Sequence, residues 1–268
     1  MDAINNFFIE DYKIKEITTI DENEIKNKVI YEVLRVIHGK ALFLENHLVR
    51  MKNSFKLINL NYPLNDKELT KSIEELIQKN NKLEGNIKIT YNVDNKKLKI
   101  FFIKHNYPIE SMYENGVKTI LYFGERENPN AKIVNQTFRD KVNNKIKEEN
   151  AYEAILVDRN GYITEGSKSN IFMIKDNVLL TSPVKAVLPG VTRKEIIEVA
   201  TENNIEVKEL EYKYSDIKEL DGMFICGTSP KVLPINQVDN IKFDKNNSII
   251  KNIMEYYNKK IEDYINKH

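Results

Sequence analysis

Short runs rich in Val, Ile, Tyr and Phe, each closed by a polar or glycine-containing turn, constrain the fold of this chain most. They lie at residues 28–37, 86–93 and 98–104 in the first half, and at 152–157 and 171–181 in the second. Runs of this length and composition, bounded by turn residues, are typical of β-strands. Because amphipathic segments of helical length lie between them, the sequence predicts an α/β protein with α+β character.

Five segments carry the spacing or the length expected of helices. They are 48–58, 66–79, 134–150, a segment that begins at Thr192, and 249–265. The helix at Thr192 is expected to start there because Thr192 and Glu195 fit a capping box. Ahead of the first helix, residues 41–44 are expected to form a short return strand.

A change of pattern near the middle of the chain predicts two domains. Residues 105–115 have no clear period and contain Pro108, so they are interpreted as a linker or domain crossing. The expected domains are a small N-terminal α/β domain at 1–112 and a larger C-terminal domain at 113–268.

Composition excludes several classes of function. The chain has 41 Lys and Arg against 40 Asp and Glu, a net charge of +1 that gives no reason to expect nucleic acid as a partner. No apolar run approaches the roughly 20 residues that a membrane-spanning helix needs. The single cysteine, Cys226, cannot form an internal disulfide, and no signal peptide is recognisable. We therefore expect a cytoplasmic protein without membrane or metal site.

Three polar segments have a composition suited to binding. Glu165 to Asn170 lie between a predicted strand and a hairpin, and residues 227–230 form a turn with backbone and hydroxyl donors. Gly190 precedes the helix predicted at Thr192, and a helix N-terminus favours phosphate because its free N–H groups and its dipole both attract an anion. Taken alone, each segment is more often an ordinary polar loop or helix start.

The order of these segments along the chain carries more information than any one of them. In sequence they are His47-x-x-Arg50, Lys132-x-x-Asn135, Tyr152-Glu153-Ala154, Glu165-Gly166-x-x-x-Asn170-x-Phe172, Leu188-Pro189-Gly190-x-Thr192-Arg193 and Gly227-Thr228. Over residues 28–240 this order resembles the class IV aminotransferases, which are the fold-type IV pyridoxal-phosphate enzymes. That group includes branched-chain aminotransferases, D-amino-acid aminotransferases and aminodeoxychorismate lyases. The resemblance implies a homodimer of two-domain chains whose larger domain has a mixed, barrel-like sheet and binds pyridoxal 5'-phosphate.

The resemblance also implies roles for two ionisable residues. Lys132 would hold the cofactor as a Schiff base and then shuttle the α-proton of the substrate. The spacing of 20 positions from Lys132 to Tyr152 matches the D-amino-acid and lyase branches without a gap. Glu165 would keep the ring nitrogen protonated, since a carboxylate favours the charged pyridinium.

The remaining implied site residues bind the cofactor or the substrate. The cofactor set adds Arg50, Asn170, Thr228 and the backbone N–H groups of Val191 and Thr192, with Arg50 making a charge-assisted contact to phosphate. The substrate set is Tyr31, Lys88 and Ser229. His47, beside Arg50, is interpreted as a structural histidine.

Four positions depart from the patterns of the family. Residues 26–30 replace a glycine-rich segment. The D-amino-acid branch has an arginine near residues 88–92 that binds the substrate carboxylate, whereas this chain has Lys88 and no arginine there. Lysine supplies a point charge there but not a bidentate fork. Gln136 stands where branched-chain enzymes usually have tyrosine, and Val33 where the lyase branch needs threonine.

Three hypotheses follow. The first is a transaminase that moves an amino group between an α-amino acid and a 2-oxo acid, with a branched-chain-like or broad hydrophobic substrate because no dedicated substrate arginine is evident. The second is an aminodeoxychorismate lyase on the same fold. The third is a non-catalytic homologue that serves as a binding protein, suggested by the missing glycine-rich segment.

Overall fold

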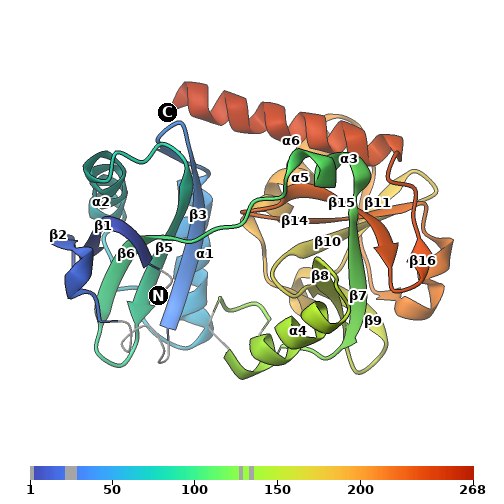
Figure 1. Ribbon diagram of the computed structural model, residues 1–268, viewed down its shortest axis with the longest axis horizontal. Helices are drawn as coiled ribbons and strands as arrows, with labels where there is room; N and C mark the ends of the chain where they lie inside the picture. Colours follow the sequence, from blue (N-terminus) through green and yellow to red (C-terminus); the bar gives the residue numbers. More distant parts are fainter. Residues whose placement is uncertain (1–2, 22–28, 127–128, 133–135) are drawn as a thin grey trace. The chain divides into compact units, whose positions relative to one another are not determined.

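The structure is a computed structural model that describes residues 3–21, 29–126, 129–132 and 136–268. The chain divides into two compact units (Figure 1). The first comprises Met1–Asn106, Ala131–Val134 and Ile261–His268, and the second comprises Tyr107–Asn130 and Asn135–Lys260. The first unit thus includes two short segments from later in the sequence, and the domain ranges 1–112 and 113–268 stay a prediction.

The first unit is built on a six-stranded antiparallel sheet with the order β2-β1-β6-β5-β3-β4. Its strands are β1 (Ala3–Glu10), β2 (Lys13–Glu16), β3 (Val29–Ile37), β4 (Lys40–Ala41), β5 (Gly85–Asn92) and β6 (Lys97–Ile103). A 3-10 turn, η1 (Ile17–Thr19), follows β2. The expected strands at 28–37, 86–93 and 98–104 are found, and Lys28 lies outside the described residues.

Two helices, α1 (Leu44–Leu57) and α2 (Asp66–Lys79), share one hydrophobic core with the sheet. The core joins Leu48 and Met51 of α1 and Ile73 of α2 to alternate residues of β3, such as Ile30 and Leu34. Side chains alternate across a strand, so Tyr31 and Val33 lie on the opposite face of the sheet from Ile30 and Leu34. Both helices therefore cover the same face, and the opposite face is left for Tyr31.

The return strand expected at residues 41–44 is present, but it is shorter and starts one residue earlier. Strand β4 ends at Ala41, and Leu44 is already the first residue of α1. Leu42 still donates its N–H to the carbonyl of Arg35 at 2.8 Å, but Phe43 adopts a left-handed conformation with φ of 52°. This conformation turns the chain out of the strand direction and into the helix.

The second unit is built on a ten-stranded mixed sheet with the order β12-β11-β10-β14-β15-β7-β8-β9-β13, in which β16 also pairs with β15. Its strands are β7 (Val117–Phe123), β8 (Glu153–Val157), β9 (Tyr162–Gly166), β10 (Asn170–Lys175), β11 (Val178–Thr181), β12 (Val207–Glu209), β13 (Tyr212–Lys213), β14 (Gly222–Gly227), β15 (Lys231–Val238) and β16 (Ile241–Lys242). Strand β7 pairs in parallel with β8 and with β15, whereas β10 and β14 are antiparallel neighbours. With the first unit, this confirms the predicted mixed α/β class.

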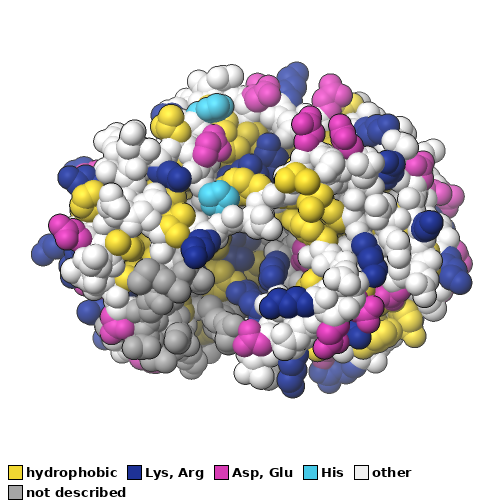
Figure 2. All heavy atoms as spheres, viewed as in Figure 1, with side chains coloured by type: hydrophobic (Ala, Val, Ile, Leu, Met, Phe, Trp, Pro, Cys, Tyr) yellow, Lys and Arg dark blue, Asp and Glu magenta, His cyan; other side chains and the backbone are white. Residues whose placement is uncertain are grey.

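Four helices accompany this sheet, together with the 3-10 turns η3 (Val184–Ala186) and η4 (Tyr214–Glu219). They are α3 (Glu110–Asn115), α4 (Gln136–Glu148), α5 (Val191–Glu202) and α6 (Ser248–Lys267), and α6 passes from the second unit into the first at residues 260–261. The predicted helices at 134–150, 192 onward and 249–265 correspond to α4, α5 and α6. Figure 2 shows acidic and basic side chains interspersed over the face in view, which agrees with the near-zero net charge.

Two local predictions in the second unit are corrected. Residues 105–115 are not wholly a linker, because Glu110–Asn115 form α3, whose six residues are too few to show a helical period. Tyr113 anchors this helix by donating from its hydroxyl to the carbonyl of Pro230 at 3.0 Å. The capping box is also wrong: Gly190 is the N-cap of α5, so Thr192 lies inside the first turn, and no side chain caps the helix.

Two further features concern the described residues as a set. No helix among them is long and apolar enough to cross a membrane. Within the same residues, no three His, Cys, Asp or Glu side chains gather in a way that would hold a metal ion. Cys226 is fully buried in β14, and burial raises the pKa of its thiol.

Candidate active site

Lys132 lies beside strand β3 in the first unit. Its carbonyl accepts the N–H of Tyr31 at 3.2 Å, and its own N–H donates to the hydroxyl of Ser54 at 3.4 Å. Its Nζ lies 4.9 Å from the centroid of the Tyr31 ring, and the Nζ of Lys88 lies 5.6 Å from the same centroid. Two ammonium groups thus lie within cation–π range of one buried aromatic ring.

A buried ionic cluster lies on the helix-covered face of the same sheet. Glu32 of β3 accepts from Nε of Arg50 at 2.9 Å and from Nη2 at 2.5 Å, and the Nδ1 of His47 lies 2.7 Å from its Oε2. These contacts place both carboxylate oxygens in bonds to α1. The bidentate pair fixes the orientation of the guanidinium and leaves its Nη1 group outside this pair.

The cluster shifts the pKa values of two groups. Burial alone would raise the pKa of Glu32, but the charge and hydrogen bonds of Arg50, with the bond to His47, lower it to about 2. Burial lowers the pKa of His47, opposed by Glu32 and supported by the positive charges of Arg50 and Lys132. His47 is therefore a buried partner of Glu32, as a structural histidine would be.

Glu165 is a buried carboxylate at the end of β9 in the second unit. Its Oε2 accepts the backbone N–H of Leu188 at 3.0 Å, and its Oε1 accepts from Nη1 of Arg126 at 3.1 Å. Only 4% of the Glu165 side chain and 17% of the Arg126 side chain are exposed. Sequence reasoning missed Arg126, because it lies in the turn-rich segment after β7, where no periodicity or motif singles it out.

Asn170 binds the carbonyl of the same residue, Leu188, which belongs to the next peptide group. Its Nδ2 donates to the carbonyl of Leu188 at 2.9 Å. A Cβ built on Gly190 would lie only 1.9 Å from Oδ1 of Asn170, so this close approach requires glycine. One turn ahead of α5 is thus shaped by residues of two motifs: Glu165 and Asn170 from the first, and Gly190 from the second.

The start of α5 meets the requirements of an anion site by its backbone. Gly190 supplies no side-chain cap, so the N–H groups of the first turn, at Val191 and Thr192, are without a capping side chain. The side chain of Arg193 does not contribute to this anion site. Its Nη2 donates to the carbonyl of Ser182 at 3.0 Å and pairs with Glu209 at 2.8 Å.

Thr228 and Ser229 lie in the turn between β14 and β15, and both are half-buried. The register pairs Asn170 of β10 with Cys226 of β14, two residues before Thr228. A Cβ on Gly227 would lie 3.8 Å from Cβ of Ser169, which places this turn beside the segment between β9 and β10. The sheet therefore brings the 227–230 turn and Asn170 to one edge.

Glu153 is a second buried carboxylate, named by a motif but given no role from the sequence. Its Oε1 accepts the N–H of Lys168 at 2.6 Å and the hydroxyl of Ser169 at 3.0 Å. A Cβ on Gly166 would approach both Ser169 Oγ, at 2.1 Å, and Glu153 Oε1, at 2.7 Å. Burial raises the pKa of Glu153, while these hydrogen bonds oppose the rise.

Each unit therefore gathers part of the expected site. The first unit brings Lys132 and Lys88 to Tyr31, and it engages Arg50 with Glu32. The second unit brings together Glu165, Asn170 and the first turn of α5, and it places Thr228 at the same sheet edge as Asn170. Asn135 and the side chain of Gln136 lie outside the described residues.

Comparison with known proteins relates this arrangement to one family. The family model described as amino-transferase class IV matches residues 29–238. A D-alanine aminotransferase of Listeria monocytogenes is 30% identical over 261 residues, covering 89% of this chain and 88% of the relative. A putative branched-chain-amino-acid aminotransferase of Methanocaldococcus jannaschii is 28% identical, covering 88% and 87%.

A solved structure gives the same result for the fold. The crystal structure of a putative branched-chain amino acid aminotransferase from Thermotoga maritima superposes with a TM-score of 0.84 at 25% identity. The match covers 97% of this chain and 95% of that one. The likeness therefore extends over nearly the whole of both chains.

Proposed function

Since the chain belongs to the class IV aminotransferase family, we propose that it binds pyridoxal 5'-phosphate through Lys132 and moves an amino group between an α-amino acid and a 2-oxo acid. Class IV aminotransferases depend on pyridoxal phosphate, and their substrates are amino acids and oxo acids. One observation carries the proposal for this chain: a buried carboxylate, Glu165, accepts the backbone N–H of Leu188, which lies just before Gly190, the N-cap of α5.

This arrangement fits a phosphorylated pyridine. A buried carboxylate suits a protonated ring nitrogen, and a glycine-led helix start suits a phosphate. Asn170 and Gly190 pack so closely that the turn between the two groups has little freedom to move. The cofactor needs a carboxylate at its cationic ring nitrogen and an anion site at its phosphate, held at a fixed separation.

The proposed roles divide by chemistry. When bound, pyridoxal phosphate supplies an electron sink that stabilises negative charge on the α-carbon of the substrate. Lys132 holds the cofactor and moves the proton at that α-carbon, and Glu165 holds the proton on the ring nitrogen. The phosphate is bound by the N–H groups of Val191 and Thr192.

Two side chains complete the proposed phosphate site. Thr228 donates from its hydroxyl, and Arg50 donates from the part of its guanidinium that Glu32 does not engage. The bidentate bond to Glu32 orients Arg50 for this contact. Asn170 contributes by holding the Leu188 carbonyl, so its proposed part in cofactor binding is indirect.

For the substrate we propose a hydrophobic amino acid, branched-chain-like or of broader range. Tyr31 offers a buried aromatic wall, Lys88 a single positive charge for a carboxylate, and Ser229 a hydroxyl donor. A lysine makes a less directional contact than an arginine fork, which suits broad specificity. A homodimer in the cytoplasm is part of the same proposal, and size-exclusion chromatography with light scattering tests the dimer.

The role of Lys132 is tested by trapping. Purified protein is expected to absorb as a pyridoxal-phosphate enzyme, and borohydride is expected to fix the cofactor on the peptide that contains Lys132, as detected by mass spectrometry. Lys132→Ala is expected to lose the trapped adduct, whereas Lys56→Ala, an exposed lysine of α1, keeps it. An adduct that persists in Lys132→Ala would show that another lysine holds the cofactor.

The reaction is tested with a panel of L- and D-amino acids paired with 2-oxoglutarate. Transfer from Leu, Ile or Val is expected to exceed transfer from Ala of either configuration. Release of pyruvate from aminodeoxychorismate without any transamination would instead identify the lyase reaction. Protein that never retains pyridoxal phosphate would contradict the proposed function as a whole.

A further inference from the structure

The segment between β9 and β10 joins two residues of the proposed cofactor site. Glu165 is the second-last residue of β9, Asn170 is the first residue of β10, and only residues 167–169 lie between the two strands. Glu165 accepts the N–H of Leu188 and Asn170 donates to its carbonyl, so both contact the turn ahead of α5. The conformation of this short segment therefore limits the positions of both side chains.

Glu153, the first residue of β8, binds all three residues of this segment through one oxygen. Its Oε1 accepts the backbone N–H of Lys168 at 2.6 Å, the hydroxyl of Ser169 at 3.0 Å and the hydroxyl of Ser167 at 3.4 Å. The backbone N–H of Ser167 also donates to the carbonyl of Ala154 at 2.9 Å. A single carboxylate oxygen thus organises the segment, together with one backbone bond to β8.

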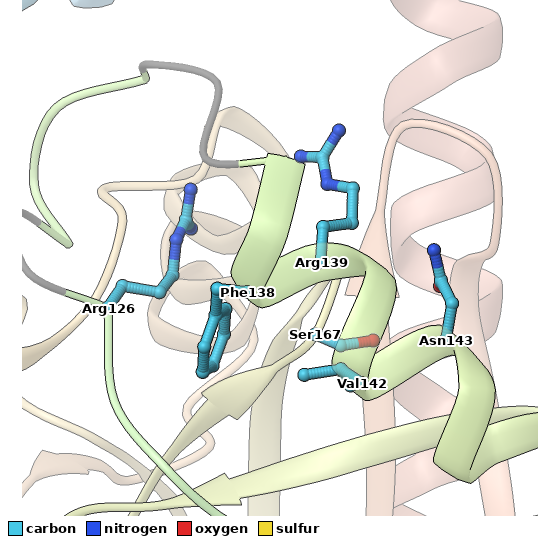
Figure 3. A pocket seen from close by; sticks show the side chains of 6 residues that line it. All are labelled: Arg126, Phe138, Arg139, Val142, Asn143 and Ser167. Atoms are coloured by element: carbon cyan, nitrogen blue, oxygen red, sulfur yellow. The ribbon is translucent and has the colours of Figure 1, made fainter.

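Close packing holds the carboxylate in this position. The side chains of Glu153 and Ser169 are buried. A Cβ on Gly166 would lie 2.7 Å from Oε1 of Glu153, so only glycine lets the end of β9 pass this close to the carboxylate. Ser167 also lines a small pocket next to α4, together with Arg126 (Figure 3). The segment is thus bounded by β8 and by α4.

The contacts of Glu153 with this segment require an acceptor rather than a charge. Burial raises the pKa of its carboxyl, and the hydrogen bonds from residues 167–169 oppose the rise. A carboxyl group still accepts through one oxygen when the other carries a proton. A buried donor left without its acceptor is strongly destabilising. The segment is therefore expected to change conformation when the acceptor is removed, and to keep it when glutamine supplies the acceptor.

We propose that Glu153 is a positioning residue of the cofactor site, which sets the relative positions of Glu165 and Asn170 by binding residues 167–169. The inference rests on the proposed function, since its effect on pyridoxal phosphate requires Glu165 and the start of α5 to bind that cofactor. Its effect on the segment itself does not, and is measured separately. Failure of the proposed function is therefore distinguishable from failure of this inference.

Asp158 provides a matched control on the same pair of strands. It follows β8 directly, and its Oδ1 accepts the backbone N–H groups of Asn160 and Tyr162, both at 2.9 Å. This is also a carboxylate oxygen that organises a short loop. Because β8 and β9 are antiparallel, that loop lies at the opposite end of the strand pair from Gly166. Loss of its contacts is expected to disturb a loop without disturbing residues 167–169.

The test measures amide hydrogen exchange of the full chain and the rate at which the holoenzyme releases pyridoxal phosphate. Glu153→Ala is expected to speed exchange at residues 165–170 and to speed release about tenfold or more, the factor that corresponds to one lost hydrogen bond. Glu153→Gln keeps the acceptor, so its release rate should stay within about threefold of wild type. Asp158→Ala should speed exchange at residues 158–162 alone and leave release within about twofold.

Ser169→Ala covers the case in which Glu153→Ala does not fold, as circular dichroism would show. It removes one of the three donors and leaves the carboxylate in place, so the fold is expected to survive. Release should still be about threefold faster than in wild type or more. A release rate unchanged in Ser169→Ala would then overturn the inference.

Three results with folded Glu153→Ala would overturn it as well: unchanged exchange at residues 165–170, a Glu153→Gln variant as impaired as Glu153→Ala, or a lower free energy of unfolding without faster release. The last result would make Glu153 a residue of the fold alone. Wild-type protein that retains no pyridoxal phosphate would contradict the proposed function, while exchange at residues 165–170 would still decide whether Glu153 positions the segment.

Discussion

Glu165 and Leu188 are joined by a buried hydrogen bond in which Oε2 of the carboxylate accepts the backbone N–H at 3.0 Å. The bond connects the end of β9 to the turn that starts α5, two elements separated by 23 positions in the sequence. It orients one carboxylate oxygen, while Arg126 binds the other. The carboxylate that we assign to the ring nitrogen is thus fixed by the same turn that presents the proposed phosphate site.

Glu165→Gln keeps the shape of the side chain but removes its negative charge, so it tests the effect of the charge alone. The amide oxygen still accepts from Leu188, but the negative charge facing Arg126 and the ring nitrogen is lost. We expect kcat to fall by roughly 10²- to 10³-fold, the size of a lost electrostatic contact in an active site. The free energy of unfolding should fall by only about 1–3 kcal/mol.

Steady-state kinetics and urea unfolding measure the two effects. The control is Glu202→Gln, which removes an exposed carboxylate near the end of α5 and should change neither quantity. An activity of Glu165→Gln within tenfold of wild type would contradict the assignment of Glu165 to the ring nitrogen.

Gly190→Ala is expected to destabilise the turn ahead of α5. The added methyl would lie 1.9 Å from Oδ1 of Asn170, and overpacking of this kind costs about 1–3 kcal/mol. Asn170→Ala removes the obstructing amide along with its bond to the Leu188 carbonyl, at a similar cost of about 1–3 kcal/mol. The double variant should therefore lose less stability than the sum of the two single variants.

Urea unfolding of the four proteins in this double-mutant cycle measures the coupling. Losses that add to within about 0.5 kcal/mol would show that the two residues do not interact. In that case the clash at Gly190 must be relieved by another movement of the turn.

Acid is expected to destabilise the chain through Glu32. The pKa of this carboxyl is about 2 in the folded protein against 4.5 ordinarily, so the unfolded state binds the proton first as pH falls. The stabilisation is complete above pH 4.5 and is lost as pH falls toward 2, by about 3 kcal/mol in total. His47 adds to the loss from below pH 6.5, because its pKa is also lowered and its neutral form is favoured in the folded state.

Free energies of unfolding from urea titrations between pH 7 and pH 3 measure this dependence. Glu32→Gln should be less stable by about 3–5 kcal/mol at pH 7, because Arg50 stays buried without its carboxylate. Its stability should then fall less with acid than that of wild type. Glu74→Gln, at an exposed position of α2, should keep the wild-type slope, and a parallel slope for Glu32→Gln would contradict the prediction.

Glu153 is expected to act in the opposite direction. Burial raises the pKa of its carboxyl in the folded protein above the ordinary 4.5, so the folded state keeps its proton longer than the unfolded state. Its favourable contribution is present below pH 4.5 and is lost as pH rises through the folded pKa. Glu153→Gln cannot ionise, so its stability relative to wild type should increase as pH rises from 4.5 to 7.

The measurement is the difference in unfolding free energy between the two proteins across that range. The amide oxygen of Gln still accepts from Lys168 and Ser169, so the fold is expected to survive the change. A difference that stays constant with pH would mean that Glu153 titrates as an ordinary exposed carboxyl.

Patterns local in sequence predicted the fold well where they were long enough. The Val, Ile and Tyr content of β3, closed by a turn, and the amphipathic pattern of α2 identified those elements, because each pattern is local in the sequence. The six residues of α3 were too few for a period, and the start of α5 was misplaced by one residue. A glycine cap leaves no capping side chain for the sequence to show.

What the sequence determined by itself is the list of chemical groups and their order: Lys132, the carboxylate in Glu165-Gly166, and the glycine ahead of α5. The order identified the family, because spacing between motifs survives when single residues change. Only the tertiary structure decided the partners. It bound Glu165 to Leu188 and Arg126, engaged Arg50 with Glu32, and placed Lys132 beside Tyr31, 101 positions away. Such partners are set by strand register and by close packing, which join residues that no local pattern relates.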